Sequence, residues 1–418
     1  MYHIRLLLVS VEAPPSNNAE AFQVGKILDE LRLRPNFTVD VVTADTPAGS
    51  STDLATLLSS DPLGTYSSQV VHLPCRLSRW QRIALRLTAP WLADRPDWSF
   101  RFSWQVQRAV RHLRNRPDLI YSRAFPPSSN LLGFKLARHY QVPWFLHLSD
   151  PWCESSLERH WARSHWHRRI ERRCFHAATR ISFTSAITME RYMQRYPELA
   201  ERMVIDPNVY TTFSINASPW SPGPRFRVVH TGSFTAERPV DPLLAALANL
   251  PAHHPLFTDL ELVQAGHSTP HSQALIRRAG PWMQDRGLLS PSEALDLQRQ
   301  ADLLLAIDWR FKAARDAQLL LSKLTDYLAL RRPVLVITHP EGVCARFVSA
   351  HHLGQAVSHD DPAGIAAAFV DYWKVWKQRE RSRFELPPPT PLYSAPWVAR
   401  SVAVAAQNTL HFSPSPAL

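Results

Sequence analysis

Short apolar runs alternate with longer amphipathic stretches along the first half of the chain. This alternation is typical of β-α-β units, which bring their strands together in a parallel sheet. The apolar runs predict strands at residues 4–11, 38–42, 70–73, 118–122, 143–148, 180–183 and 203–205. The amphipathic stretches predict helices at residues 19–33, 99–115, 128–140, 155–177 and 186–195. An open sheet covered by helices is therefore expected in this half.

Residues 207–224 interrupt the alternation with PNVYTTFSINASPWSPGP, which is rich in Pro, Ser and Asn and predicts a linker. A second alternating series follows, with strands expected at residues 225–231, 260–264, 301–307, 333–337 and 354–357. We therefore expect two doubly wound α/β domains, at residues 1–206 and 225–384. The tail at 385–418 should hold a Pro-rich spacer and an apolar helix near 397–410.

The length and composition are those of a folded protein with more than one core. A chain of 418 residues exceeds the usual size of one domain. Hydrophobic residues make up 45% and charged residues 20%, which excludes large-scale disorder. No apolar run approaches the roughly 18 residues that cross a bilayer. The opening MYHIRLLLVSVEAPP is interrupted by Glu12 and predicts a first buried strand rather than a signal peptide.

The cysteine and histidine spacings predict no metal site. The four cysteines are far apart and form no C-x-x-C pair, which also argues against a disulfide framework and fits a reducing cytoplasm. His160, His165 and His167 do not share one helical face, and no D-x-D motif is present.

Polar residues follow the first predicted strand of the second domain. In open parallel sheets, ligands bind beyond the carboxyl ends of the strands. The sequence HTGSFTAERP there contains Gly232, Ser233 and Arg238 directly before a predicted helix. Free amides at a helix start, together with a guanidinium group, suit a diphosphate. An ordinary tight turn with a solvated arginine remains the alternative.

The stretch SKLTDYLALRRPVLVI predicts a helix that turns into a buried strand. Ser322 is expected to cap this helix, and Lys323 and Asp326 share a face because they are three residues apart. A lysine near a helix N-terminus is unfavourable unless an anion binds there. The alternative is a solvated surface pair. Arg331 and Arg332 are expected only to solvate the turn.

A carboxylate follows a strand of the first domain in HLSDPW. Pro151 disfavours helical geometry at Asp150 and so places this residue at the strand end, where it can act as a base or orient a hydroxyl group. A turn or helix cap is the alternative role for Asp150. His147 lies inside the strand, either as a core residue or facing the cleft, where it is the second candidate catalytic residue.

Basic and aromatic residues alternate in two segments, at 158–180 and 76–91. The net charge of +11 favours an anionic partner such as a nucleotide, a phospholipid surface or nucleic acid. The two segments suit an anionic membrane surface with aromatic rings at headgroup depth, or are simply solvated helix faces. Nothing resembles a known nucleic-acid-binding module, so no nucleic-acid partner is predicted.

Together these motifs resemble the glycosyltransferase family 4 group of retaining enzymes over most of the chain. HTGSFTAERPVDPLLAAL is similar to the family's strand, turn and helix at the donor diphosphate. SKLTDYLALRRPVLVI is similar to its P-K-L-x-E-Y-L-A-x-G-x-P-V-L signature, and VPWFLHLSDPW resembles its R-D-P-W-like segment. The resemblance implies an α/β, GT-B fold, in which two Rossmann-like doubly wound domains face each other across a cleft. It also implies that the N-terminal domain binds the acceptor and the C-terminal domain the nucleotide sugar.

The resemblance also implies roles for single residues. Arg238 and Lys323 would hold the donor diphosphate without a metal ion. Asp326 falls at the second Glu of the family's E-x7-E pair and would bind the ribose, whereas Gln318 stands at the first Glu position. Asp150 falls near the position where the acceptor hydroxyl meets the anomeric carbon.

We therefore expect a metal-independent, retaining glycosyltransferase that needs no cofactor beyond its nucleotide-sugar donor. It would move a hexose to a lipid-linked or polysaccharide-precursor acceptor on the cytoplasmic face of the plasma membrane. The substituted position Gln318 leaves open a catalytically silent GT-B protein that binds a glycan or a membrane. A nucleotide-sugar epimerase and a nucleic-acid binder are further alternatives.

Overall fold

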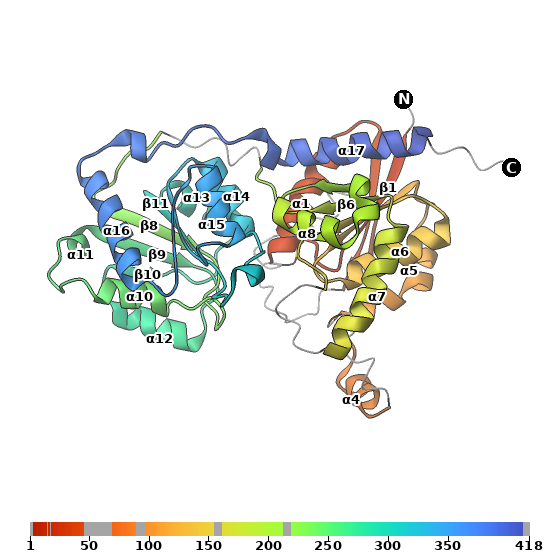
Figure 1. Cartoon of the computed structure of the whole chain (residues 1–418), viewed down its shortest axis with the longest axis horizontal. Coiled ribbons are helices and arrows are strands. Elements are labelled where there is room, and N and C mark those ends of the chain that lie inside the picture. Colours follow the sequence, from red (N-terminus) through yellow and green to blue (C-terminus); the bar gives the residue numbers. More distant parts are fainter. Residues whose placement is uncertain are drawn as a thin grey trace. The chain divides into compact units, whose positions relative to one another are not determined.

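The computed structural model describes residues 3–14, 16, 18–45, 69–88, 97, 99–153, 161–211 and 219–412. The chain divides into two compact units (Figure 1). Unit 1 comprises residues 1–209 and 394–418, and unit 2 comprises residues 210–393. Each unit is built on its own parallel sheet, as the alternating pattern predicts.

Unit 1 holds a seven-stranded sheet with the order β3-β2-β1-β4-β5-β6-β7. Its strands are β1 (Ile4–Val9), β2 (Phe37–Ala44), β3 (Gln69–Leu73), β4 (Leu119–Ala124), β5 (Trp144–Leu148), β6 (Arg180–Phe183) and β7 (Met203–Ile205). Its helices are α1 (Ala19–Arg32), α4 (Arg79–Thr88), α5 (Val106–His112), α6 (Ser128–Tyr140), α7 (Trp161–Ala177), α8 (Ala186–Arg195) and α17 (Ala395–Phe412), with short 3-10 helices η2 (Phe102–Trp104) and η3 (Pro197–Arg202). The strand order reverses direction between β1 and β4.

The predicted helix at 99–115 is wrong as a single element, because the chain forms η2 and α5 instead. Phe100 and Phe102 are both buried. Residues two apart lie on opposite sides of an α-helix, so a continuous helix would expose one of these rings. Burial of both rings therefore outweighs helical continuity.

The C-terminal helix α17 packs on α1, more than 360 residues earlier in the chain (Figure 1). Val398, Val402 and Ala406 form a buried stripe along α17 at helical spacing. Ile27 and Leu31 of α1 belong to the same hydrophobic cluster. The last helix of the chain thus completes the core of unit 1.

Unit 2 holds a six-stranded sheet with the order β10-β9-β8-β11-β12-β13. Its strands are β8 (Phe226–Thr231), β9 (Leu260–Ala265), β10 (Met283–Asp285), β11 (Leu303–Ile307), β12 (Val334–Ile337) and β13 (Gly354–Val357). Its helices are α10 (Asp241–Ala248), α11 (Leu256–Asp259), α12 (Pro270–Ala279), α13 (Pro291–Arg299), α14 (Ser322–Leu330), α15 (Val343–Ala350) and α16 (Pro362–Lys377), with 3-10 helices η4 (Ala314–Asp316), η5 (Arg381–Arg383) and η6 (Pro391–Tyr393). The edge strand β10 was not predicted because MQD carries no apolar run.

Arg331 and Arg332 do more than solvate a turn. Arg331 ends α14 in the left-handed conformation, with φ of 57°. Its Nε donates to the carbonyl oxygen of Leu386 at 2.7 Å. Arg332 is buried, and the negative charges of Glu385 and Asp302 lie close enough to affect its pKa, which burial nevertheless lowers. The two arginines therefore fasten the Pro-rich segment to unit 2.

Candidate functional site

The carboxyl ends of the central strands in unit 2 carry the residues that the sequence singled out. The strand order reverses between β8 and β11, and such a reversal is where open α/β sheets bind ligands. β8 ends at Thr231 and is followed by Gly232 and Ser233, both half-buried. β11 ends before the buried Asp308. These strand ends form the base of the candidate site.

Lys323 reaches this edge from the first turn of α14. A Cβ atom added to Gly232 would lie 2.1 Å from Lys323 Nζ and 3.2 Å from Cε. A side chain at position 232 would therefore occupy the space that the ammonium group fills. Gln264 and Gly266 hold this strand end in place, because Gln264 Nε2 donates to the Gly232 carbonyl at 2.7 Å and a Cβ at Gly266 would lie 2.3 Å from the same oxygen.

The electrostatic surroundings of Lys323 favour an incoming anion. Burial, followed by the positive charge of Arg238, lowers the pKa of Lys323 to about 7, although Asp308 opposes this shift. The Asp308 carboxylate accepts hydrogen bonds from Thr338 Oγ1 at 2.7 Å and from the Trp309 backbone N–H at 2.8 Å. Two cations thus share one edge of the sheet, and a bound diphosphate would relieve their repulsion.

His230 lies beneath this pair of cations and is neutral. Burial, followed by the charge of Lys323, lowers the pKa of His230 well below its usual range. Its Nδ1–H donates to the Leu305 carbonyl oxygen at 2.9 Å, which leaves Nε2 as an acceptor. Nε2 is buried and has no hydrogen-bond partner in the described part of the chain. His230 was not among the predicted site residues, and the only sign of it in the sequence is a histidine inside an apolar strand.

Arg238 is positioned by a short turn and an aromatic ring. The Thr235 backbone N–H donates to the Arg238 carbonyl oxygen, and the Arg238 N–H donates to Thr235 Oγ1, both at 3.2 Å. The guanidinium carbon lies 5.5 Å from the centroid of the Trp309 ring, within cation–π range. Its position is therefore set by contacts beyond the turn itself.

The start of α14 differs from the prediction. Ser322 is the first helical residue and not the cap, so the expected capping role is wrong. The cap position belongs to Leu321, whose backbone N–H donates to Cys344 Sγ at 3.5 Å. No side chain caps the first turn, although the Leu324 N–H donates to the Leu321 carbonyl oxygen at 3.0 Å; the amides of Ser322 and Lys323 lie at the helix start without a side-chain cap.

The two remaining predicted donor residues lie on either side of Lys323 in the sequence. Gln318 is buried just before α14, and Asp326 is half-buried one turn along that helix. The Gln318 segment is fixed to α15, because the Val343 N–H donates to the Ala317 carbonyl oxygen at 2.9 Å. The structure therefore brings Gly232, Lys323 and Arg238 together and leaves their role in binding to be tested.

Replacing Gly232 with alanine should displace the Lys323 ammonium group and strain the backbone at this turn, because residues with a Cβ rarely adopt its φ of 158°. The new methyl group meets the flexible end of a side chain, so Lys323 can move away. We expect about a tenfold loss of affinity for a nucleotide sugar, and a loss of about 1 kcal/mol in unfolding free energy from the strained backbone. Isothermal titration calorimetry and thermal unfolding measure the two quantities.

Gly287→Ala is the matched control, because Gly287 also has a positive φ, of 63°, and no atom of the described residues beyond its chain neighbours lies within 4 Å of a Cβ there. Equal affinities for the wild type and Gly232→Ala would show that the position of the ammonium group is unimportant.

Asp150 follows β5 in unit 1, half-buried, in a segment that helices α7 and α8 hold in place. The Trp152 N–H donates to the Tyr192 hydroxyl at 3.0 Å, and that hydroxyl donates to Glu171 Oε2 at 3.0 Å. The Cys153 N–H donates to the same carboxylate at 3.1 Å. A buried carboxylate therefore fixes the loop that carries Asp150.

His147 is fully buried within β5, which does not suit direct contact with a substrate. Its Nδ1 lies 3.0 Å from Ser182 Oγ on the neighbouring strand β6. Burial, followed by the charges of Arg123 and Arg180, lowers the pKa of His147 well below its usual range. We expect His147 to position the end of β5.

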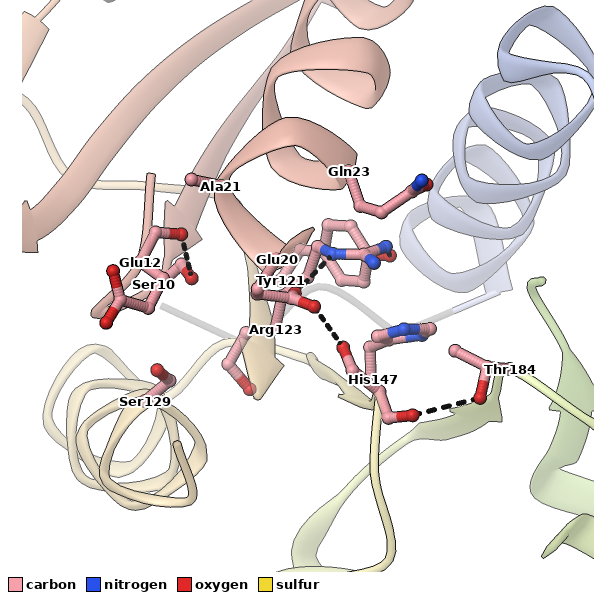
Figure 2. A network of polar contacts seen from close by, with 12 residues as sticks. Ser10, Glu12, Glu20, Ala21, Gln23, Tyr121, Arg123, Ser129, His147 and Thr184 are labelled. Atoms are coloured by element: carbon pink, nitrogen blue, oxygen red, sulfur yellow. Dashed lines mark hydrogen bonds and ion pairs between the residues drawn. The ribbon is translucent and has the colours of Figure 1, made fainter. Parts of the chain in front are cut away.

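A buried ion pair at the same sheet edge was missed by the sequence analysis. Figure 2 shows Arg123, Glu20 and Tyr121 pointing toward one another. Arg123 Nε lies 3.1 Å from Glu20 Oε1, and Arg123 Nη1 donates to the Tyr121 hydroxyl at 3.1 Å. Ser149 Oγ donates to Glu20 Oε2 at 2.5 Å, which links the pair to the segment before Asp150. The available signal was an arginine within the apolar run LIYSRA.

The described part of the basic segment at 158–180 buries one of its aromatic rings and half-buries another. Residues 158–160 and the side chain of Trp161 lie outside the described residues. Within α7, Phe175 is fully buried and Trp166 is half-buried. Phe175, one of the aromatic residues of this segment, therefore packs in the core of unit 1 and does not contribute to an aromatic surface.

The described ranges hold neither a candidate metal site nor a membrane-spanning helix. No three His, Cys, Asp or Glu side chains gather there as a candidate metal site. The described helices are also too short or too polar to cross a bilayer.

Known proteins resemble the chain in family and in fold. Residues 23–208 match the family described as "Glycosyl transferase 4-like domain". No match was found among curated protein sequences. Among solved structures, a glycosyltransferase from Rickettsia africae ESF-5 is 10% identical, with a TM-score of 0.64, and the alignment covers 99% of this chain and 100% of that one.

Two further solved structures share the fold. A putative UDP-N-acetylglucosamine 2-epimerase from Listeria monocytogenes is 11% identical, with a TM-score of 0.58 and coverage of 99% of this chain and 98% of that one. The N-terminal domain of trehalose-6-phosphate phosphatase from Candida albicans is 13% identical, with a TM-score of 0.64 and coverage of 98% and 99%. At these identities the likeness shows the fold alone, which is GT-B.

Proposed function

We propose that the chain is a retaining, metal-independent hexosyltransferase, and the match of residues 23–208 to the glycosyl transferase 4-like family supports this proposal. It takes the hexose from a nucleotide sugar and gives it to a lipid-linked or polysaccharide-precursor acceptor. The observation that carries the proposal is the pair of cations in unit 2, Arg238 and Lys323, with the lysine held against Gly232.

The proposed chemistry places the donor diphosphate at this pair of cations. When the bond between the anomeric carbon and the phosphate oxygen breaks, negative charge grows on the leaving nucleoside diphosphate. Lys323 and Arg238 stabilise that charge, and the uncapped first turn of α14 adds its amides. Asp326 binds the ribose in this proposal. Gln318 lies near the sugar, where its amide replaces the carboxylate of the family pattern.

Asp150 takes the acceptor hydroxyl in unit 1. Its loop is fastened to the buried Glu171, and a fixed carboxylate can orient a hydroxyl and receive its proton. The Arg123–Glu20 pair supports the same edge through Ser149. A rigid strand end is what such positioning needs.

The experiment that tests the proposal has two stages. Thermal shift with a panel of nucleotide sugars identifies the donor, because a ligand that binds the native state stabilises it. Release of nucleoside diphosphate is then measured with and without lipid-linked acceptors. Transfer that persists in Asp150→Asn would remove Asp150 from the catalytic role, and failure of every donor to bind would reject the proposal.

A catalytically silent protein is the second candidate, because Gln318 replaces an acidic residue of the family pattern. Donor binding without nucleotide release across a broad acceptor panel would favour it. An epimeric nucleotide sugar formed without any acceptor would instead indicate an epimerase.

The affinity for the nucleotide sugar should fall as the pH rises from 6 to 8. The pKa of Lys323 is about 7 in the free protein, so its ammonium group is charged at pH 6 and mostly neutral at pH 8. The diphosphate of a nucleotide sugar stays ionised across this range, and binding requires the charged lysine. We expect a loss of up to about tenfold, measured by calorimetry at each pH.

Lys323→Arg should flatten this pH profile, because a guanidinium group stays protonated. A wild-type affinity that is constant from pH 6 to pH 8 would show that Lys323 does not titrate in the donor site.

A further inference from the structure

The helix α4 exposes a row of large apolar side chains. Trp80, Ile83 and Leu87 are 77%, 40% and 80% exposed. At 100° per residue they fall within about 60° of one another around the helix. The described residues of unit 1 therefore leave this stripe uncovered, and Figure 1 shows α4 beyond the end of α7, away from the sheet of its unit.

The start of α4 is encoded locally. The Gln81 N–H donates to Ser78 Oγ at 3.2 Å, and the Ser78 N–H donates to Gln81 Oε1 at 3.0 Å. This reciprocal pair is a capping box, which stabilises a helix start without tertiary contacts. The Arg101 guanidinium donates to the Arg76 carbonyl oxygen at 2.8 Å and anchors the chain just before the helix.

The charge around the stripe has one sign. Arginines stand at positions 76, 79, 82 and 86, and the sequence from Gln69 to Ala93 contains no acidic residue. Arg79 and Arg86 are exposed and lie beside the apolar row. An apolar face flanked by arginines, with a tryptophan near one end, suits the boundary between anionic headgroups and acyl chains. Nucleic acid would use the arginines but not Ile83 and Leu87.

We propose that α4 is an interfacial helix that docks unit 1 on an anionic lipid surface. Trp80, Ile83 and Leu87 enter the headgroup boundary, and the neighbouring arginines bind lipid phosphates. Docking on the lipid surface would bring unit 1 to the proposed lipid-linked acceptor, and this purpose rests on the proposed function. Its test is independent of transfer activity.

The test is flotation of the full-length protein with vesicles of phosphatidylcholine containing about one third phosphatidylglycerol, at physiological ionic strength. We expect binding at least about tenfold stronger than to phosphatidylcholine alone. The double variant Trp80→Ser/Leu87→Ser should lose at least about tenfold in vesicle affinity. Binding equal to that of the wild type, or no binding by the wild type, would overturn the proposal.

A matched control is available on α17, where Trp397 and Val404 are 50% and 44% exposed and have the same spacing of seven residues. Trp397→Ser/Val404→Ser should keep wild-type vesicle binding, and an equal loss in both double variants would reject α4 as the specific site. A loss of self-association in Trp80→Ser/Leu87→Ser, with vesicle binding unchanged, would assign the stripe to a second copy of the chain.

Charge is tested in the same way. Arg79→Glu/Arg86→Glu should abolish the preference for anionic vesicles. Arg277→Glu/Arg278→Glu changes the net charge by the same amount, on exposed residues of α12, and should keep the preference for anionic vesicles. If both variants lose binding equally, the attraction comes from overall charge and not from α4.

Donor binding separates the two proposals. Lys323→Ala should float like the wild type, and Trp80→Ser/Leu87→Ser should bind the nucleotide sugar like the wild type. Vesicle binding without any donor binding would reject the transferase proposal and support the interfacial helix. Donor binding without vesicle binding would support the transferase proposal and reject the interfacial helix.

Discussion

Replacing Lys323 with alanine is expected to lower kcat/KM for the nucleotide sugar by about a hundredfold to a thousandfold. Removing one fixed donor from a site where charge develops has effects of this size. The structure gives the reason, because the ammonium group is packed against the Gly232 backbone beside Arg238. Steady-state release of nucleoside diphosphate measures the effect.

Lys377→Ala is the control for loss of a lysine. Lys377 is more than half exposed and pairs with Asp259 at 3.0 Å on the surface of unit 2. Its kcat/KM should stay within about twofold of the wild type, since exposed ion pairs contribute little. Turnover of Lys323→Ala at the wild-type rate would place the donor diphosphate elsewhere.

The second large effect is expected on stability, from Arg123→Met. The substitution leaves the Glu20 carboxylate buried without its cation, and breaking a buried pair in this way costs about 3–5 kcal/mol. Native-state hydrogen exchange of α1 and β4 reports this loss within unit 1, because the pair joins these two elements.

Two variants give this prediction its controls. Arg32→Ala removes an exposed partner of Asp29 on α1 and should change the unfolding free energy by no more than about 0.5 kcal/mol. Adding Glu20→Gln to Arg123→Met should recover part of the loss, because the uncompensated charge is gone. An Arg123→Met protein with wild-type exchange rates would show that the pair contributes nothing to the stability of unit 1.

Local sequence patterns predicted the elements around both sites well. The strands β6, β7 and β13 and the helices α6 and α8 have the predicted bounds, because apolar period and turn residues act within a few positions. At Ser322, the local sequence did not predict the start of the helix correctly. This residue type suits a cap, but the backbone at Leu321 is fixed by Cys344 from another helix, and the helix begins at Ser322, one residue earlier than predicted.

Contacts between distant positions were beyond prediction from one sequence. The Gly232 and Lys323 motifs were each recognised, but their close contact depends on how α14 packs against the end of β8. Glu20 and Arg123 are 103 positions apart, and only the pairing of β4 beside β1 brings them together. Burial of an arginine also needs a specific partner, which composition does not reveal.

By itself, the sequence determined two alternating α/β series, the strand ends that carry polar residues, and a strongly basic surface. Those features follow from periodicity and charge, which a chain displays whether or not it is folded. Only the tertiary structure decided that α17 completes the core of unit 1, that Phe175 is buried while Trp80 is exposed, and that Lys323 lies against Gly232. The physical reason is that burial and proximity arise from packing among residues far apart in the chain.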